Sequence, residues 1–472
     1  MSAFKQSMRK LGVRAGLLAG ASAAVLAISG VTAGSALAAP NCTPEGVNVQ
    51  GAGSSLQKSA EEIWTGREVP SGTIAGLTEI PHKANALANS YREKCAAKTT
   101  PPTVSYTSTG SGPALEAFRF TGAGTEINHK LSFIGTDDAP SAAQITHAQE
   151  VVGTSKAVIV PVSQTAIAVL VHPPANCALG EITWADLNKV FGGNGIKKWS
   201  EFSTKKEEVA GACNSAITRV VRAEGSGTTY QFKNYLQVLH TEKGAEKLPC
   251  KVKYVKKPGE EAETEEWKDL EPSIEGGKPN ITWPQCAEST TVVTAAGGGA
   301  LAEKVAGTAG TIGYASLPDA KAKGATAAKL QNGEVGVEKT YAEPGNKASE
   351  TARCVNSRYD VPTGGKVGES GVSVDWSTVF GAVPSIGGKE YPLCTLTYLV
   401  GWTLYEQAGY GVGSEATIGK LTQDYIKNYV VPAAEGQAAI AGKWYSALPS
   451  TEAEANTFNV QGAAALAAEK VN

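Results

Sequence analysis

The chain has 472 residues, of which 42% are hydrophobic and 19% are charged, and its formal net charge is -2 at pH 7. At a prior of about 150 residues per domain, this length provides two or three units with large cores. Because basic residues are not in excess, the composition argues against nucleic acid as the main partner.

Residues 1–38 have the pattern of a signal peptide. They start with basic side chains, continue with a short apolar run and end with the A-x-A cleavage site Ala36-Leu37-Ala38. No later stretch approaches the roughly 20 uninterrupted apolar residues that a membrane-spanning helix needs. No lipidation motif precedes Cys42. We therefore expect an exported protein, periplasmic or extracellular at the cell envelope, that is not lipid-anchored.

All eight cysteines follow this segment. An even number in an exported chain predicts disulfides, and the absence of C-x-x-C argues against zinc or a redox pair. Eight cysteines allow many pairings, and the sequence does not choose among them. We favour consecutive pairs, namely Cys42–Cys95, Cys177–Cys213, Cys250–Cys286 and Cys354–Cys394.

From residue 103 onward, short β-branched or aromatic runs alternate with helical patterns. The strand-like runs cover residues 103–107, 131–135, 157–162, 166–172, 217–222 and 311–315. Such alternation is typical of an α/β architecture with mixed sheets. Two stretches, between Cys250 and Cys286 and over residues 321–389, are poor in long apolar runs. We expect surface insertions there, formed by a hairpin or by loops that cysteines hold.

Four loops share one design, in which a strand-like run ends in small polar residues and a helical pattern follows. They lie at residues 51–56, 108–112, 135–140 and 222–229, and Pro140 in the third suits a first helical turn. The free N–H groups and the dipole at a helix N-terminus favour an anion. One such loop is usually explained by a Ser or Asp N-cap. Four of them, one preceded by an arginine, predict a single anion site.

Motifs of other phosphate sites and of catalysis do not occur. The sequence has no P-loop, no G-x-G-x-x-G between a strand and a helix, no G-x-S-x-G elbow and no H-E-x-x-H. Its 5 histidines are scattered, which is typical of surface or core positions. We therefore expect a binding protein, not an enzyme, without a metal or a cofactor.

At the four loops the sequence resembles the phosphate-binding proteins of ABC phosphate transporters. GAGSSL is similar to that family's GAG-[ST]-[ST]-F motif, YTSTGSG to its Y-x-x-x-GS-[SG]-G, GTDDAP to its G-x-SDAP, and VVRAEGSGTT to its VVR-x-DGSGT. Residues 182–199, 310–314 and 391–393 also resemble family segments, so the match is ordered and spans most of the chain. The combination is specific, whereas GSGT alone is common.

The resemblance implies a two-lobed type II periplasmic-binding-protein fold, which is an α/β fold with mixed sheets and a ligand cleft between the lobes. Lobe I would comprise residues 44–162 and 316–472, and lobe II residues 163–315. The lobes would close on inorganic phosphate. The implied partners are phosphate and the membrane permease of an ABC transporter, and the protein itself is expected to be a monomer.

The resemblance also implies a phosphate-binding set, comprising Ser55, Leu56, Ser111, Asp138, Arg222, Ser226, Gly227 and Thr228. The arginine would supply a fork of donors and the main positive charge, while hydroxyls and the N–H groups of Leu56 and Gly227 complete the shell. As an ionised acceptor, Asp138 would take the proton of HPO₄²⁻ or H₂PO₄⁻ in a hydrogen bond. Fully ionised sulfate lacks that proton and would meet a buried like charge.

The sequence departs from the family pattern at three places. Leu56 stands where the family usually has Phe, and Glu224 replaces the Asp that pairs with the arginine, so that its extra methylene can shift Arg222. Insertions at residues 66–100, 244–284 and 321–390 have no counterpart in shorter members. Simpler readings also exist, since Asp138 beside Asp137 could be an N-cap and Arg222 could form a structural ion pair with Glu224.

Three alternative functions remain open. The same fold could bind another tetrahedral oxyanion; Asp138 argues against sulfate but not against arsenate, which is also protonated. A secreted phosphatase would need a metal cluster or an activated nucleophile, and the sequence offers neither. A surface or interaction protein could have kept the fold, lost transport and used its insertions to bind a partner.

Overall fold

The structure is a computed structural model. It describes residues 39–472 except for 75–76, 78–87, 193–194, 244–247, 249, 258–259, 271–280, 286–290, 336–337, 346–353, 355–374, 380–389, 442 and 450–459. The predicted signal peptide lies outside the described residues. Ala38–Asn472 forms one compact unit. Within the described ranges, no helix combines the length and the apolar character that crossing a membrane requires.

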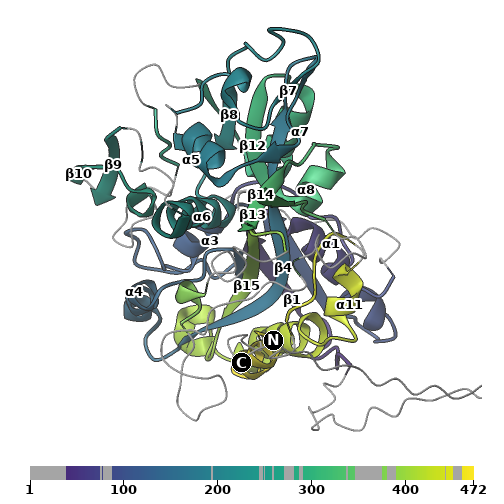
Figure 1. Cartoon of the computed structure of the whole chain (residues 1–472). Coiled ribbons are helices and arrows are strands. Elements are labelled where there is room, and N and C mark those ends of the chain that lie inside the picture. Colours follow the sequence, from purple (N-terminus) through teal and green to yellow (C-terminus); the bar gives the residue numbers. More distant parts are fainter. Residues whose placement is uncertain are drawn as a thin grey trace, which may run out of the picture. The chain divides into compact units, whose positions relative to one another are not determined.

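An eight-stranded sheet forms the centre of this unit, in the order β11-β8-β12-β4-β15-β3-β1-β2 (Figure 1). β1 is parallel to β2 and β3, and β8 is parallel to β11 and β12. β15 is antiparallel to β3 and β4, and β12 is antiparallel to β4. The sheet is therefore mixed, and the predicted α/β class is confirmed. Its strands are β1 (Asn48–Gly53), β2 (Thr103–Ser108), β3 (Phe133–Thr136), β4 (Ala157–His172), β8 (Thr218–Arg222), β11 (Thr291–Ala295), β12 (Thr311–Ser316) and β15 (Cys394–Trp402).

The long strand β4 joins two halves of the sheet. Its first part, residues 157–166, pairs with β15, and its last part, residues 167–172, pairs with β12. We call β2, β1, β3 and β15 sheet half A, and β12, β8 and β11 sheet half B. The division into lobes at residues 162/163 and 315/316 remains a prediction.

The sequence predicted two strands where the structure has the single strand β4. Polar residues at 163–165 interrupt the apolar pattern, and that interruption suggested a break. In the structure all three side chains are buried, and those of Gln164 and Thr165 are hydrogen-bonded. Gln164 Nε2 donates to Ala447 O at 2.7 Å, and Thr165 Oγ1 donates to Trp444 O at 3.1 Å. Because these polar groups find partners in the tertiary fold, the strand continues through them.

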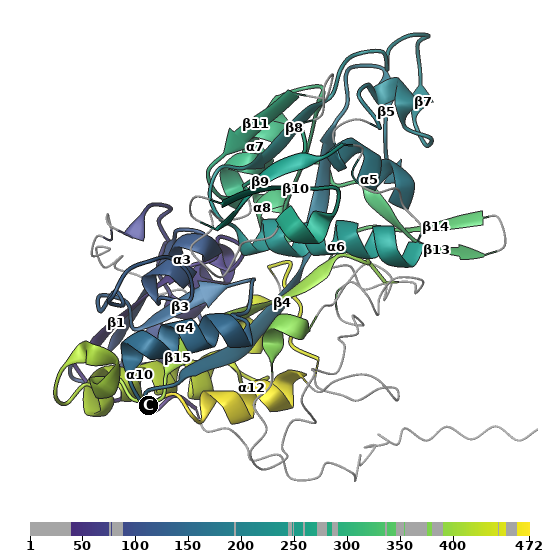
Figure 2. The same ribbon diagram turned by 90° about the vertical axis from the view of Figure 1, so that its left-hand side faces the viewer.

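Helices cover both halves of the sheet (Figures 1 and 2). α7 packs on β8, β12 and β4, α12 packs on β4, α1 packs on β2, and α3 packs on β1 and β3. The helices are α1 (Lys58–Thr65), α2 (Tyr91–Lys94), α3 (Ser111–Ala117), α4 (Ala142–Val152), α5 (Trp184–Gly192), α6 (Gly227–Lys243), α7 (Gly297–Gly307), α8 (Leu317–Ala322), α10 (Lys420–Gln423), α11 (Gly436–Ile440) and α12 (Val460–Ala468).

Smaller elements extend from this core. The strand pairs β9–β10 and β13–β14 are antiparallel hairpins, β13 also pairs with β6, and β5 pairs with β7. The short strands are β5 (Cys177–Ala178), β6 (Glu181–Ile182), β7 (Lys206–Glu207), β9 (Val252–Lys257), β10 (Glu260–Thr264), β13 (Lys329–Val335) and β14 (Glu338–Ala342). Short 3₁₀ or π turns are η2 (Trp199–Glu201), η3 (Trp267–Leu270), η6 (Trp376–Thr378), η7 (Glu406–Tyr410), η8 (Glu415–Gly419) and η9 (Asp424–Val430).

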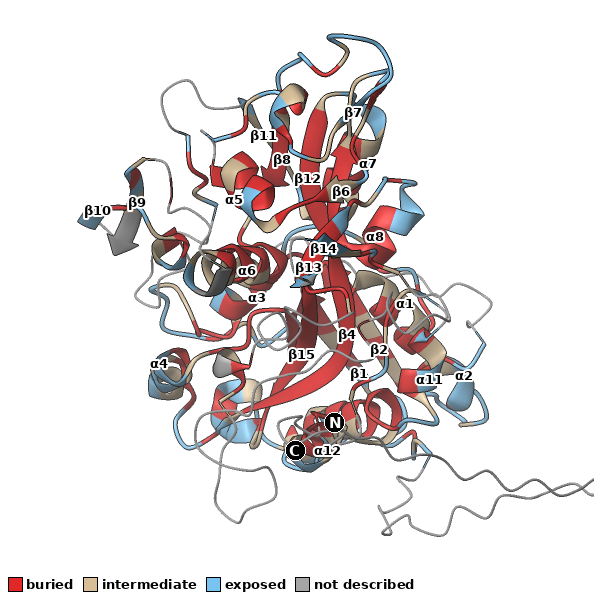
Figure 3. Ribbon diagram, in the orientation of Figure 1, coloured by how far each residue is buried: buried red, intermediate tan, exposed pale blue. Residues whose placement is uncertain are grey.

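The central strands are buried almost completely (Figure 3). β12 and β15 are buried along their whole length, and β4 is buried except at its two terminal residues. Strands that are covered on both faces need apolar side chains on both faces. This explains the apolar runs on both sides of the polar residues 163–165 in β4.

Three of the four predicted disulfides are confirmed, and they are Cys42–Cys95, Cys177–Cys213 and Cys354–Cys394. Cys250 is disulfide-bonded as well. Cys286 lies outside the described residues, so the predicted pair Cys250–Cys286 remains a prediction. Cys42–Cys95 and Cys354–Cys394 close loops that fall partly in the insertions, whereas Cys177–Cys213 lies outside them.

The stretch between Cys250 and Cys286 contains the expected hairpin, β9–β10, but it is more than a surface insertion. Trp267, Leu270 and Trp283 are buried. Lys233 on α6, itself fully buried, donates through Nζ to Leu270 O at 3.1 Å and to Thr282 O at 2.6 Å. The described part of this insertion therefore packs against the helix that follows the fourth predicted loop.

Candidate anion-binding site

The four predicted loops meet at one place. The first lies between β1 and α1, the second at the start of α3, the third after β3, and the fourth between β8 and α6. Gly112 N donates to Gly225 O at 3.1 Å, which joins the second loop to the fourth. Gln231 Nε2 on α6 donates to Asp137 O at 2.9 Å. Loops from sheet half A thus contact loops from sheet half B.

Gly227, the first residue of α6, makes the closest approach between these loops. A Cβ atom placed there would lie 2.7 Å from Ser111 Oγ, 2.8 Å from Asp137 Cβ and 2.8 Å from Asp138 N. Distances below about 3 Å are too short for carbon contacts, so a side chain would force the loops apart. Glycine is therefore required for the amino end of α6 to reach the second and third loops.

The predicted serines are buried and accept backbone N–H groups. Ser55 Oγ accepts Gly298 N at 3.3 Å, and Ser111 Oγ accepts Asp137 N at 3.2 Å. Because each of these bonds uses an oxygen lone pair, it does not consume the hydroxyl hydrogen, which can still be donated to an anion. Ser226 Oγ accepts Thr229 N at 3.2 Å, so this serine caps α6 as the simpler reading proposed.

Two other predicted donors are engaged within the protein. Leu56 N donates to Ser54 Oγ at 3.0 Å, and Thr228 Oγ1 donates to Asp137 Oδ2 at 3.0 Å. Ser54 in turn donates its hydroxyl to the other oxygen of Asp137. The carboxylate of Asp137 is therefore held by one hydroxyl from each half of the sheet.

Asp138 is buried, with 6% of its surface exposed. No described residue donates a hydrogen bond to its carboxylate; its N–H donates to Thr136 Oγ1 at 3.0 Å. Burial and the neighbouring Asp137 raise the pKa of Asp138 to about 8. Burial also raises the pKa of Asp137, but its hydroxyl donors and Arg222 oppose that effect. The two adjacent acids thus differ in that, among the described residues, only the carboxylate of Asp137 accepts hydrogen bonds from the protein.

The structure excludes the simpler reading of Asp138 as an N-cap, and the expected place of Pro140 in a first helical turn was wrong. Asp138 is not an N-cap, because the N-cap of α4 is Ser141, whose side chain forms a capping box with Gln144. Pro140 precedes that cap and does not lie in the first helical turn. Ser141 is the N-cap because its hydroxyl accepts the N–H of Gln144, while the side-chain oxygen of Gln144 accepts the N–H of Ser141. The side chain of Asp138 is consequently not used by the helix.

Arg222 is 2% exposed and forms the predicted ion pair with Glu224. Its Nε donates to Glu224 Oε1 at 2.7 Å, and its Nη2 donates to the same oxygen. Gly297 N, at the start of α7, also donates to that oxygen at 3.0 Å. Glu224 therefore orients the arginine as the family's Asp is expected to do, and the extra methylene does not prevent the pair.

Three further residues of the site were missed by the sequence reasoning, namely Ser54, Asp137 as a hydrogen-bonded group, and Asp319. Asp319 on α8 is buried; burial raises its pKa to about 6, which a hydrogen bond from Ser316 and the charge of Arg222 oppose. The signal for Asp137 was present, because it occupies the position of Ser in the G-x-SDAP pattern. No motif marked Asp319.

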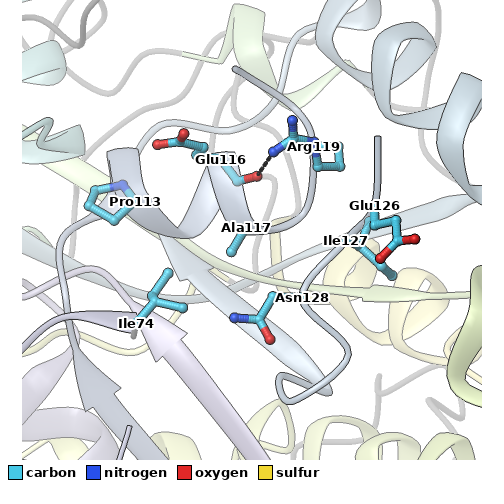
Figure 4. Close-up of a pocket in the computed structure, with 8 residues that line it drawn as sticks. All are labelled: Ile74, Pro113, Glu116, Ala117, Arg119, Glu126, Ile127 and Asn128. Carbon is cyan, nitrogen blue, oxygen red and sulfur yellow. Dashed lines mark hydrogen bonds between the residues drawn. The ribbon is translucent and has the colours of Figure 1, made fainter. Parts of the chain in front are cut away.

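A separate pocket of about 430 Å³ lies beside α3, and none of its lining residues belongs to the predicted set (Figure 4). Ile74, Pro113 and Ala117 contribute apolar surface, and Glu116 and Arg119 contribute polar groups. Arg119 Nη1 donates to the backbone oxygen of Glu116 at 3.3 Å. This pocket is distinct from the convergence of the four loops.

The comparisons with known proteins agree with the fold. A family model described as a PBP superfamily domain matches residues 69–400. Solved structures with similar folds include a high-affinity periplasmic phosphate-binding protein, PfluDING, bound with phosphate (17% identity, TM-score 0.51), a DING protein (19%, 0.51) and a human phosphate-binding apolipoprotein (18%, 0.50). Each alignment covers 88% of this chain and 97%, 98% and 93% of the other chain, respectively. No curated protein sequence matches this chain.

Proposed function

The chain belongs to the PBP superfamily, and from that premise we propose that it is an exported binding protein that captures inorganic phosphate at the four-loop site for an ABC importer. The observation that carries the proposal is the meeting of the four loops at one place, to which they bring two buried groups of opposite chemistry, the guanidinium of Arg222 and the carboxyl of Asp138. Each loop matched a separate motif in the sequence, and no element of secondary structure alone would bring them together.

The charges at this place fit a protonated oxyanion. Arg222 supplies a fixed guanidinium that Glu224 orients, and a carboxylate or phosphate oxygen is its preferred partner. The hydroxyl hydrogens of Ser55 and Ser111 add neutral donors. Asp138 adds an acceptor without a protein donor, which an O–H group of the ligand can satisfy. We infer that the ligand carries at least one proton, as phosphate does and sulfate does not.

Two further observations support the wider role. Structures with the same fold carry names that specify phosphate binding. The disulfides support export, since such bonds persist mainly in oxidising compartments. Transfer to a membrane permease, a monomeric state and the absence of catalysis follow from the family resemblance and belong to the same proposal.

Calorimetry on the protein from residue 39 onward, freed of bound anion by unfolding and refolding, tests the proposal. We expect one phosphate per chain with micromolar or tighter affinity, and no competition from sulfate. Arsenate, which is protonated like phosphate, should compete. If millimolar phosphate produces neither heat nor a shift in melting temperature, the proposed function is wrong.

A further inference from the structure

Asp137 is a buried acid of the site for which the phosphate-binding role gives no use. It stands where the G-x-SDAP pattern has Ser, directly before Asp138, and 1% of its surface is exposed. Its carboxylate accepts the hydroxyl of Ser54 from sheet half A and, at 3.0 Å, that of Thr228 from α6. Thr228 is itself a predicted phosphate ligand, so Asp137 touches the place where the anion is proposed to bind.

The position of Asp137 brings a second carboxylate, beside that of Asp138, to the proposed anion-binding position. The first residue of α6, Gly227, approaches both Asp137 Cβ and Asp138 N so closely that no Cβ atom fits between them. An anion at the amino end of α6, within reach of Arg222, therefore lies beside both acids. A carboxylate has about four acceptor positions, so Asp137 can accept a ligand O–H while keeping Ser54 and Thr228.

The surrounding charges leave Arg222 as the main positive charge that acts on Asp137. The titratable or charged groups that interact with Asp137 are Asp138, Arg222, Tyr106, Tyr398 and Tyr445. Burial raises the pKa values of these three tyrosines, so they remain neutral at ordinary pH. Arg222 is already shared with Glu224 and acts on Asp319. A dianion would add two negative charges to a buried site that is rich in carboxylates.

Resting on the proposed function, we infer that Asp137 makes the site select the doubly protonated monoanion H₂PO₄⁻, with Asp137 and Asp138 each accepting one of its two O–H groups. A family-type site with Ser at this position has one carboxylate acceptor and can hold HPO₄²⁻. The phosphate complex of this protein therefore holds one proton more than the phosphate complex of such a family-type site. Whether that proton resides on the phosphate or on the acid pair, the number of protons in the complex is the same.

The consequence is a proton uptake that appears at alkaline pH. Because the pKa of Asp138 is about 8, the free acid pair loses its proton above that pH, where free phosphate is HPO₄²⁻. Forming a complex that contains two protons then requires one proton from solvent. By linkage, the affinity for phosphate falls by up to about tenfold for each pH unit above about pH 8. Without Asp137 no extra proton is needed, and the affinity should change little over the same range.

Calorimetric titration with phosphate between about pH 8 and about pH 9.5, for the wild type and for Asp137→Asn, tests the inference. We expect the affinity of the wild type to fall steeply and that of Asp137→Asn to stay nearly constant, so that at the upper end the variant binds about tenfold more tightly. Titrations in two buffers with different ionisation enthalpies should report uptake of about one proton by the wild type and none by the variant.

Asp319→Asn is the matched control, since it also removes a buried acid near Arg222 but should not remove the dependence on pH. An affinity of the wild type that is constant above pH 8, or an equally steep fall in Asp137→Asn, overturns this inference and leaves the proposed function standing. Lack of phosphate binding by both proteins at every pH overturns the proposed function, and this inference with it. If Asp137→Asn does not fold, Asp137→Ser, which restores the residue of the G-x-SDAP pattern, replaces it in the same titrations with the same expected and contradicting results.

Discussion

Asp138 differs from the other acids of the site because its carboxylate accepts no hydrogen bond from a described residue, although it is buried. An acceptor without a donor costs free energy in a folded protein, and it is tolerated where a ligand supplies the donor. Arg222, by contrast, is held by Glu224 before any ligand arrives. We therefore expect the arginine to attract oxyanions in general, and Asp138 to favour those oxyanions that carry a proton.

Replacing Asp138 with Asn should change the choice of anion more than the strength of binding. Above about pH 8, where the Asp138 carboxyl is ionised, Asn keeps the shape but removes the negative charge that repels sulfate, so the preference for phosphate over sulfate should fall by about 100-fold or more. Equilibrium titration with each anion measures the change. Asp319→Asn should strengthen the binding of both anions by a similar factor, because it removes a negative charge near Arg222 without removing a predicted hydrogen bond to the anion. An unchanged preference in Asp138→Asn would place the selectivity elsewhere.

The sequence predicted the site at the level of loops better than at the level of single bonds. The structure brings the loops of all eight predicted residues together, because the motifs mark strand ends and helix starts. In the structure, however, Leu56 N donates to Ser54 Oγ and Thr228 Oγ1 donates to Asp137 Oδ2, and the sequence could not indicate either bond. Such bonds depend on distances between residues far apart in the chain. Their phosphate-binding roles remain predictions.

At the scale of elements, α6 links the site to an insertion whose role the sequence left open. The amino end of α6 carries Gly227 and Thr228. Further along the helix, Lys233 donates to Leu270 O and Thr282 O and lies 4.8 Å from the centre of the Trp283 ring. Arg219 on β8 is also buried and donates to Pro284 O at 2.6 Å. The insertion thus supports both elements that flank the fourth loop.

Lys233→Met should destabilise the protein by about 2 to 4 kcal/mol, because the buried carbonyls lose a charged donor. Urea unfolding followed by circular dichroism measures this difference. Lys321→Met is a suitable control, since Lys321 lies 5.0 Å from the Trp444 ring but is exposed, and its loss should cost less than about 0.5 kcal/mol. Equal effects of the two substitutions would mean that the insertion does not depend on Lys233.

The elements that the sequence predicted well are those with a local cause. β2, β8 and β12 appear close to their expected bounds, and the helical pattern expected after the fourth loop forms α6. The errors have two causes. In β4, tertiary contacts decide, since Gln164 and Thr165 are satisfied by residues more than 270 positions away. At α4 the cause is local, because the capping box of Ser141 and Gln144, and not Pro140, sets the start of the helix.

At the scale of the whole molecule, the account depends on two groups of loops that meet across the sheet. Contacts from Gly298 to Ser55, from Gly112 to Gly225 and from Thr228 to Asp137 connect sheet half A with sheet half B. One predicted lobe boundary lies within β4, a few residues before its partner changes from β15 to β12. The order of motifs along the chain predicted the superfamily, while the lobe boundaries remain a prediction.

The most direct measurement is a crystal structure of the protein grown in saturating phosphate. The account predicts one tetrahedral anion among the four loops, with Arg222 and the hydroxyls of Ser55 and Ser111 donating to it and the Asp138 carboxylate within hydrogen-bond distance of a phosphate oxygen. An empty site between these loops under saturating phosphate, or an anion that is bound only elsewhere on the molecule, would contradict it.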